Sequence, residues 1–130
     1  MTNNSKSQFS SRSLNHSKLL SVLLGNNNEL LVLLDEQRII KYLSPSATKI
    51  TGWSDDDLLN TLFEQLPFHP DDRTATESLL QKAIENQDKT IPVQFRLQHK
   101  KKHYINFEGS IRNLLKDEGV KAILLHARHV

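Results

Sequence analysis

The sequence has no cysteine among its 130 residues. Disulfide scaffolds, thiol nucleophiles and thiolate metal sites are therefore excluded. No apolar run is longer than about half a dozen residues, whereas a helix that spans a membrane needs roughly 18 or more. Residues 1–13 also lack the apolar segment of a secretion signal. We expect one domain, located in the cytoplasm, that is long enough to bury a core of its own.

Common enzyme motifs are missing as well. The chain has no Gly-rich phosphate loop and no elbow that carries a nucleophilic serine or cysteine. His69, Asp71 and Asp72 could still act as a general base and a carboxylate pair, which makes a small hydrolase or isomerase the alternative function. The two carboxylates have a simpler role, because acidic side chains at a helix start favour the positive end of its dipole. We therefore expect no catalytic residue and no enzymatic activity.

The six histidines do not form a recognisable metal site. His99 and His103 flank a run of three lysines, while His126 and His129 on a strand would face opposite sides of the sheet. A zinc site needs three or four converging ligands. We therefore expect no metal ligand.

Positive charge is concentrated late in the chain. Residues 29–90 carry twelve Asp or Glu and six Lys or Arg, whereas residues 91–130 carry three and eight. Lys100–Lys102 lie at a predicted turn, which favours a solvated hairpin tip. Only Tyr104 is available nearby to stack on a base, so we expect no nucleic-acid partner.

The stretch Ile39–Trp53 predicts a strand that turns directly into a short helix. Ser44 is a good N-cap, Pro45 fits the first helical position, and Gly52 is a natural left-handed end. A second short helix should follow and end at Asn60. A long amphipathic helix is predicted over about Pro70–Asn86.

Five strands follow from the pattern of apolar residues. The first and the last are apolar on both faces, which places them in the middle of a covered sheet. The strand that contains Pro92 should lie at an edge, because proline cannot donate a hydrogen bond to a neighbouring strand. The predicted strands are Glu29–Asp35, Arg38–Leu43, Ile91–Gln98, Tyr104–Leu115 and Val120–Val130.

The N-terminal region is expected to hold a flexible tail over residues 1–13 and a helix over residues 14–25. Apolar residues cover more than one face of this helix, so it should dock on the sheet or on a second copy of the chain. We therefore predict a homodimer that forms through this helix and the outer face of the sheet. The candidate interface residues are Leu19, Leu20, Val22, Leu23 and Leu24.

Five motifs in register over residues 29–130 resemble those of the PAS sensory domains. They are Tyr42-Leu43-Ser44-Pro45, Thr51-Gly52-Trp53, Asp57-Leu58-Leu59, His69-Pro70-Asp71-Asp72 and Gln94-Phe95-Arg96-Leu97. The resemblance implies an α+β fold with a five-stranded antiparallel sheet of order 2-1-5-4-3, helices on one face and the N-terminal helix on the other. It also implies a non-catalytic sensory and dimerisation module of a bacterial signalling protein. The downstream effector, a sensor histidine kinase or a cyclic-dinucleotide enzyme, is expected beyond residue 130.

Some residues depart from the family pattern, and the absence of others restricts which cofactor the chain could bind. Asn60 replaces the usual glycine, and Ala127-Arg128-His129-Val130 stands where the family often ends in Arg-Asp-Ile-Thr. Haem-binding members use a histidine on the long helix, but Pro70–Asn86 contains none. Flavin photosensors and members with a thioester-linked chromophore need a cysteine. The cofactor is therefore unknown, with haem not expected and a cysteine-linked flavin or chromophore excluded.

The space between the long helix and the sheet is the candidate ligand site. Its apolar residues could line a pocket for a small apolar ligand, or they could fill the space completely as core. The sequence shows no unpaired polar group that would orient a ligand there. The candidate pocket residues are Leu62, Phe63, Phe68, Leu79, Val93, Phe95, Ile105, Phe107, Ile123 and Leu125.

Overall fold

The elements follow one another in the order expected from the sequence. The computed structural model describes residues 29–87 and 89–130. Its elements are β1 (Glu29–Leu34), β2 (Ile40–Leu43), α2 (Pro45–Thr51), α3 (Asp55–Leu58), the 3₁₀ turn η1 (Phe63–Gln65), α4 (Pro70–Glu85), β3 (Thr90–Gln98), β4 (Tyr104–Leu114) and β5 (Ala122–His129). The expected tail over residues 1–13 and the expected helix over residues 14–25 lie outside the described residues.

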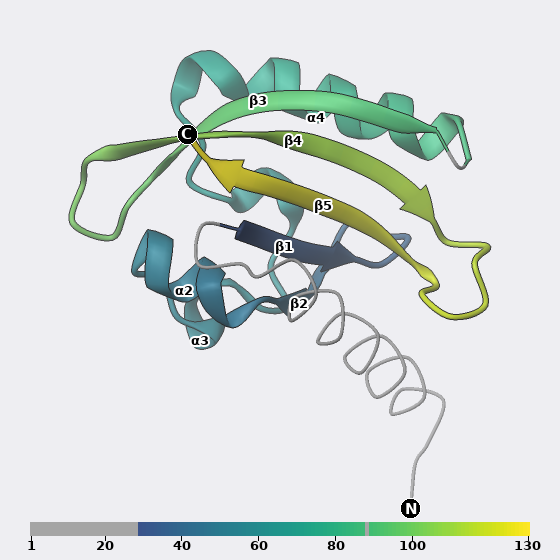
Figure 1. Ribbon diagram of the computed structural model, residues 1–130, viewed down its shortest axis with the longest axis horizontal. Coiled ribbons are helices and arrows are strands. Elements are labelled where there is room, and N and C mark those ends of the chain that lie inside the picture. Colours follow the sequence, from purple (N-terminus) through teal and green to yellow (C-terminus); the bar gives the residue numbers. More distant parts are fainter. Residues whose placement is uncertain (1–28, 88) are drawn as a thin grey trace, which may run out of the picture.

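The five strands form one antiparallel sheet of order β2-β1-β5-β4-β3, which confirms the predicted order (Figure 1). The two strands that are apolar on both faces, β1 and β5, are paired with each other near the centre. Strand β3, which contains Pro92, lies at one edge, as predicted. Helix α4 runs along β3 and β4 and packs against them.

Helix α2 begins and ends at the expected residues. Pro45 occupies its first turn, and Gly52 ends it in the left-handed region with φ of 80°. Ser44 is the N-cap residue, as predicted, but its side chain makes no capping hydrogen bond. Instead its Oγ accepts the N–H of Leu31 at 3.1 Å, so a buried strand donor takes the hydroxyl that the helix start would otherwise use.

Helix α3 carries a complete capping box. The Ser54 hydroxyl accepts the Asp57 N–H, and the Asp57 carboxylate accepts the Ser54 N–H. Asn60 then adopts the left-handed conformation predicted for it, with φ of 67°. Lys121 is also left-handed, and β5 begins only after it, at Ala122 rather than at Val120.

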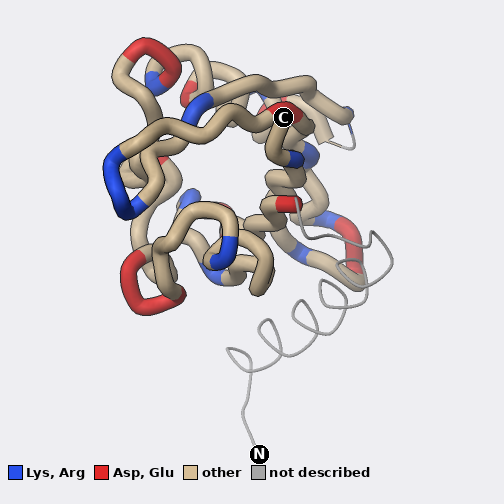
Figure 2. The backbone as a smooth tube through the Cα atoms, turned by 60° about the vertical axis from the view of Figure 1, so that its left-hand side comes forward, with Lys and Arg blue, Asp and Glu red and all other residues tan. Residues whose placement is uncertain are grey.

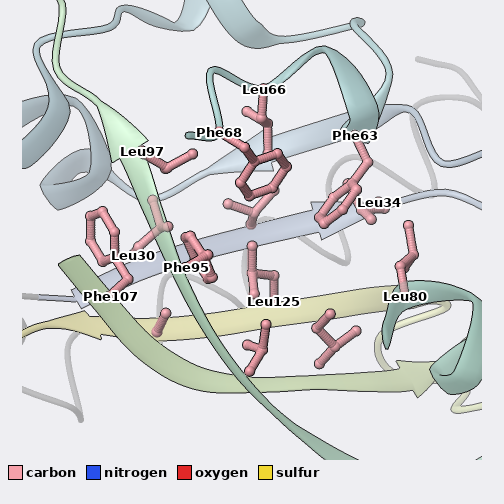
Figure 3. Close-up of a cluster of buried hydrophobic side chains, with 14 of the residues drawn as sticks. Leu30, Leu34, Phe63, Leu66, Phe68, Leu80, Phe95, Leu97, Phe107 and Leu125 are labelled. Atoms are coloured by element: carbon pink, nitrogen blue, oxygen red, sulfur yellow. The ribbon is translucent and has the colours of Figure 1, made fainter. Parts of the chain in front are cut away.

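Two apolar clusters cover the two faces of the sheet. The inner cluster lies between the sheet and the helices, and its side chains point toward one another in Figure 3. The outer cluster lies on the opposite face over β1, β2 and β5. Its buried members are Leu31, Leu33, Tyr42, Val120 and Ala122, with Leu114 and Leu124 packed beside them.

Candidate functional site

Trp53 lies where the chain leaves α2 and enters α3. The Thr51 hydroxyl donates to the Ala47 carbonyl at 2.7 Å, and the Gly52 N–H donates to the Thr48 carbonyl at 2.8 Å. These bonds complete the last turn of α2, after which the left-handed Gly52 redirects the chain. The indole of Trp53 is thereby turned toward the β3–β4 hairpin.

The tip of the β3–β4 hairpin is fastened to this corner. The Trp53 indole N–H donates to the Gln98 carbonyl at 2.7 Å, and the Lys100 N–H donates to the Thr51 carbonyl at 2.9 Å. The Lys100 ammonium lies 3.4 Å from the Asp57 carboxylate and 6.0 Å from the centre of the Trp53 ring. The lysine run at the tip therefore faces the acidic start of α3, as the charges in Figure 2 show.

A small and largely enclosed cavity of about 10 Å³ lies beneath this corner. Its volume is roughly that of one water molecule, but its apolar wall offers a water too few hydrogen-bonding partners. The wall combines side chains of the sheet with side chains of the helices and their connections. They are Leu30, Val32, Leu43, Ala47, Thr51, Trp53, Leu58, Leu66, Pro67 and Leu97.

The ten candidate pocket residues lie elsewhere in the inner layer. Eight of them are buried members of the inner cluster, Leu79 packs partly buried against it, and Leu62 forms an isolated bridge with Ile39 outside it. Their aromatic rings fill the space directly: Phe95 stacks on Phe107 at 5.4 Å and contacts Phe68 edge-on at 5.5 Å. None of the ten lines the enclosed cavity. Their role in holding a ligand stays a prediction.

The His69–Asp72 corner has a structural partner for each group of the alternative catalytic reading. Asp72 accepts hydrogen bonds from the Arg96 N–H at 2.8 Å and from its guanidinium at 2.9 Å with each oxygen. The hydrogen bond from the Arg96 side chain is the main reason that the pKa of Asp72 lies below its ordinary value. His69 Nδ1 accepts the Asp71 N–H at 3.0 Å, and its ring lies 4.7 Å from that of Tyr104. The Asp72–Arg96 contact thus joins α4 to β3, and His69 Nδ1 caps the start of α4.

The two histidines that flank the lysine run meet at the hairpin tip. The rings of His99 and His103 are stacked with their centres 4.5 Å apart. Burial, then His103, then Lys101 lower the pKa of His99 below its ordinary value. Within the described residues, no three or more His, Cys, Asp or Glu side chains are grouped so that they could hold a metal ion.

A shallow groove of about 600 Å³ runs along β3, β4 and β5 and is lined mostly by residues of their outer face, together with Leu79 of α4 and the inner-face residues Val93 and Ala127. Its charged side chains are paired within the chain: Arg128 contacts Glu108 at 3.2 Å, and His126 contacts Glu29. The groove therefore presents a polar and nearly neutral surface beside the apolar outer cluster. Its lining residues are Glu29, Leu79, Pro92, Val93, Gln94, Glu108, Gly109, Ser110, His126, Ala127 and Arg128.

The sequence did not predict which residues line the cavity, nor the hydrogen bond from the Trp53 indole to the Gln98 carbonyl. One signal was present, since a half-buried tryptophan needs an acceptor for its indole N–H. The acceptor itself, the carbonyl of Gln98, is 45 residues away and could not be found from spacing. In the part of the chain that the structure describes, no helix is both long and apolar enough to cross a membrane.

Solved structures with the same fold come from several organisms. The PAS domain of a protein from Colwellia psychrerythraea is 19% identical, with a TM-score of 0.66 over 86% of this chain and 97% of that one. The PAS-B domain of Drosophila melanogaster Cycle, with bound ethylene glycol, is 16% identical, with a TM-score of 0.63 over 78% and 97%. A sensory box histidine kinase/response regulator from Burkholderia thailandensis is 23% identical, with a TM-score of 0.60 over 87% and 83%.

A search of curated proteins finds no match. A family model described as the PAS fold matches residues 40–126, which reach from the start of β2 into β5. This range contains all the helical elements described above and most of the sheet. Because the sheet order, the helical layer and the family match all agree, the chain belongs to the PAS family.

Proposed function

We propose that this chain is a non-catalytic sensory module of a bacterial signalling protein. A small apolar ligand binds beneath α2 and α3, and the outer face of the sheet carries the response to a second copy of the chain and to an effector domain. PAS domains in general are sensory modules, commonly dimerise and commonly act with effector domains. The similarity to a sensory box histidine kinase/response regulator favours a kinase effector over a cyclic-dinucleotide enzyme.

The enclosed apolar cavity is the observation that carries this proposal. It lies at the junction of the sheet with two short helices, α2 and α3, which have 7 and 4 residues. Short helices gain little stability by themselves and depend on their tertiary contacts. The cover of this cavity can therefore shift to enlarge it more easily than the sheet that forms its floor.

The cavity wall indicates the class of ligand. Thr51 carries the one side-chain hydroxyl of the wall, and this hydroxyl is already hydrogen-bonded to the Ala47 carbonyl. The Trp53 indole N–H is likewise bonded to Gln98. A polar ligand would lose its bonds to water without finding replacements, at a cost of about 1–3 kcal/mol per group. The wall therefore suits a hydrocarbon-like ligand.

The outer apolar cluster supports the proposed route of output. Leu31 and Leu33 are buried on the face of β1 that points away from the helices. The neighbouring residues Leu30 and Val32 face the inner cluster and the cavity. A change in the shape of the cavity thus acts on a strand whose other face carries an apolar surface. We propose that the segment Leu14–Leu24 covers this surface and joins two copies of the chain.

Sedimentation velocity tests the dimer. We expect the full chain to be dimeric and a version without residues 1–25 to be monomeric. Leu124→Asp places a charge in the outer apolar cluster and should weaken the dimer, whereas Ser110→Asp, in the polar groove on the same face, is its matched control. A full chain that stays monomeric over the whole accessible concentration range contradicts the dimer.

Native mass spectrometry of the purified full chain tests ligand binding. We expect a small apolar molecule to accompany the protein or to be taken up from a mixture of hydrocarbons. A protein that never carries any such molecule contradicts the ligand while leaving the dimer to be judged by sedimentation.

A further inference from the structure

The enclosed cavity has a thin side. Seven of its ten lining residues are buried, but Trp53, Leu58 and Pro67 are partly exposed to solvent while they also line the cavity. A wall residue that touches both the cavity and the solvent marks a place where the wall is one side chain thick. The wall is therefore thinnest at these three side chains.

A single residue of the hairpin closes this thin side. The N–H of Gln98 donates to the Pro67 carbonyl at 2.8 Å, and its C=O accepts the Trp53 indole N–H at 2.7 Å. Two of the three thin-wall residues are thus joined through the backbone of one β3 residue, Gln98. Lys100 adds a second fastening, because its N–H bonds to Thr51 and its ammonium reaches Asp57 of α3.

The Lys100–Asp57 ion pair is weak enough to break without unfolding the domain. The Lys100 side chain is 55% exposed and the Asp57 side chain 34% exposed, and exposed pairs of this kind contribute little to folding. The corner also has a natural hinge, since Gly52 is in the left-handed conformation. The His99 ring fills the space where a side chain at Gly52 would lie, with Cε1 only 2.8 Å from an ideal Cβ. Hairpin tip and hinge are therefore in direct contact.

We propose that the hairpin tip, Gln98–Lys100, is a strap that gates the cavity. Release of Trp53 and Lys100 opens the thin side and admits the ligand, and closure seals the ligand from water. The inference rests on the proposed function, because the gate matters to signalling only if the cavity takes a ligand. The opening itself is a property of the chain and can be measured without any ligand.

Hydrogen exchange of the Trp53 indole N–H measures the opening directly. Trp53 is the only tryptophan of the chain, so its indole signal in an NMR spectrum is unambiguous. We expect this proton to exchange faster than the amides of the central strand β5. The Lys100→Ala variant should accelerate the exchange roughly three- to tenfold, because it loses one exposed ion pair and one cation–π contact. Lys101→Ala is the matched control, because it removes the same charge, and the Lys101 side chain affects the tip only through its charge near His99, while its backbone N–H bonds to His99 Nδ1. It should change the rate less than twofold.

Benzene serves as the probe for ligand entry. An apolar cavity of roughly 150 Å³ binds benzene, so Leu66→Ala, which removes a buried wall residue, should create a site for it. Leu58→Ala, at a partly exposed wall position, replaces it if the first variant does not fold. We expect Lys100→Ala in this background to speed benzene association three- to tenfold, as seen in NMR line shapes, and Lys101→Ala to leave it unchanged.

The outcomes separate the gate from the ligand. If the indole exchanges only as slowly as the β5 amides, or if both lysine variants have the same effect, the gate is wrong. If both lysine variants give the same rate of benzene association, entry does not pass the strap and the gate is wrong. If the exchange rates follow the expectation but neither enlarged cavity binds benzene, the strap opens as proposed and the ligand part of the proposed function fails.

Discussion

Replacing Asp72 by asparagine tests the contact that joins the start of α4 to β3. The carboxylate accepts three hydrogen bonds from Arg96, one from its backbone and two from its guanidinium. Asparagine has almost the same shape and keeps one oxygen that can still accept the backbone N–H. The same oxygen also accepts the Nε–H of Arg96, so the substitution removes the charge and the acceptor for Nη2, and leaves the other two bonds with a neutral acceptor.

The expected loss of stability follows from the exposure of the two partners. Hydrogen bonds to charged groups contribute about 1.5–3 kcal/mol each when well shielded. The Asp72 side chain is 19% exposed and that of Arg96 38%, so screening by solvent reduces the effect of the substitution on each guanidinium bond below this range, to about 1 kcal/mol. Loss of the negative charge at the helix start adds about 0.5 kcal/mol. The Asp72→Asn variant should be less stable by about 2.5 kcal/mol.

Urea unfolding followed by circular dichroism measures this difference. Asp71→Asn is the control: Asp71 lies in the same helical turn, but its side chain is 79% exposed and its ion pair is a longer one, 3.9 Å from His69 Nδ1. It should lose only the helix-dipole contribution, about 0.5 kcal/mol. Equal losses for the two variants would refute the argument, because they would show that charge at the helix start matters and the Arg96 contact does not.

The pH dependence gives an independent check of the same contact. Hydrogen bonding to Arg96 holds the pKa of Asp72 in the folded protein below the ordinary value of 3.8. The stabilisation is therefore fully present above pH 3.8 and is lost as the pH falls through the folded pKa. The difference between the natural chain and Asp72→Asn should shrink over that range. A difference that stays constant down to strongly acidic pH contradicts the ion pair as its cause.

Three further predictions concern other parts of the fold. Gly109→Ala should destabilise the chain by more than about 3 kcal/mol in urea unfolding, because an ideal Cβ would lie 2.0 Å from the carbonyl oxygen of His126 on the paired strand; a loss below about 1 kcal/mol would contradict this. Phe63→Ala should cost about 3–5 kcal/mol in the same assay, because this side chain is completely buried in the inner cluster, and a near-neutral result would show that the core refills the space. Burial and then His103 lower the pKa of His99 below 6.5, so the free energy of unfolding should fall as the pH drops from 7 through 6.5 toward the pKa of the folded protein. The His99→Gln variant should flatten this pH dependence. An unchanged slope would exclude His99 as its source.

The sheet could be predicted because its signals lie within short stretches of sequence. Strands that are apolar on both faces must be covered on both faces, which placed β1 and β5 at the centre. Pro92 marked β3 as an edge strand, and Gly52 marked the end of α2, because each residue restricts the backbone in a way that its neighbours do not change. The side-chain bonding of Ser44 could not be predicted in this way, because its hydroxyl accepts the N–H of Leu31, a residue of strand β1.

The candidate site was predicted only as a layer. The apolar pattern identified the residues that face the helices, and most of these do fill the inner cluster. Periodicity predicts which face of a strand or helix a residue lies on, but not how closely the side chains of two packed elements fit together. A cavity is the space that remains where they do not fit. The enclosed cavity is therefore lined by a different set, which includes Leu30, Val32 and Leu66.

The sequence by itself determined the order of the elements, the central strands, the helix ends and the family, because all of these depend on propensities and patterns within a few residues. Only the tertiary structure decided where Trp53 bonds, which side of the cavity is thin, and that the backbone of Gln98 joins Trp53 to Pro67. These three segments lie far apart in the chain and meet only after the sheet has formed. Their contacts depend on the twist and packing of the whole domain, which no local pattern records.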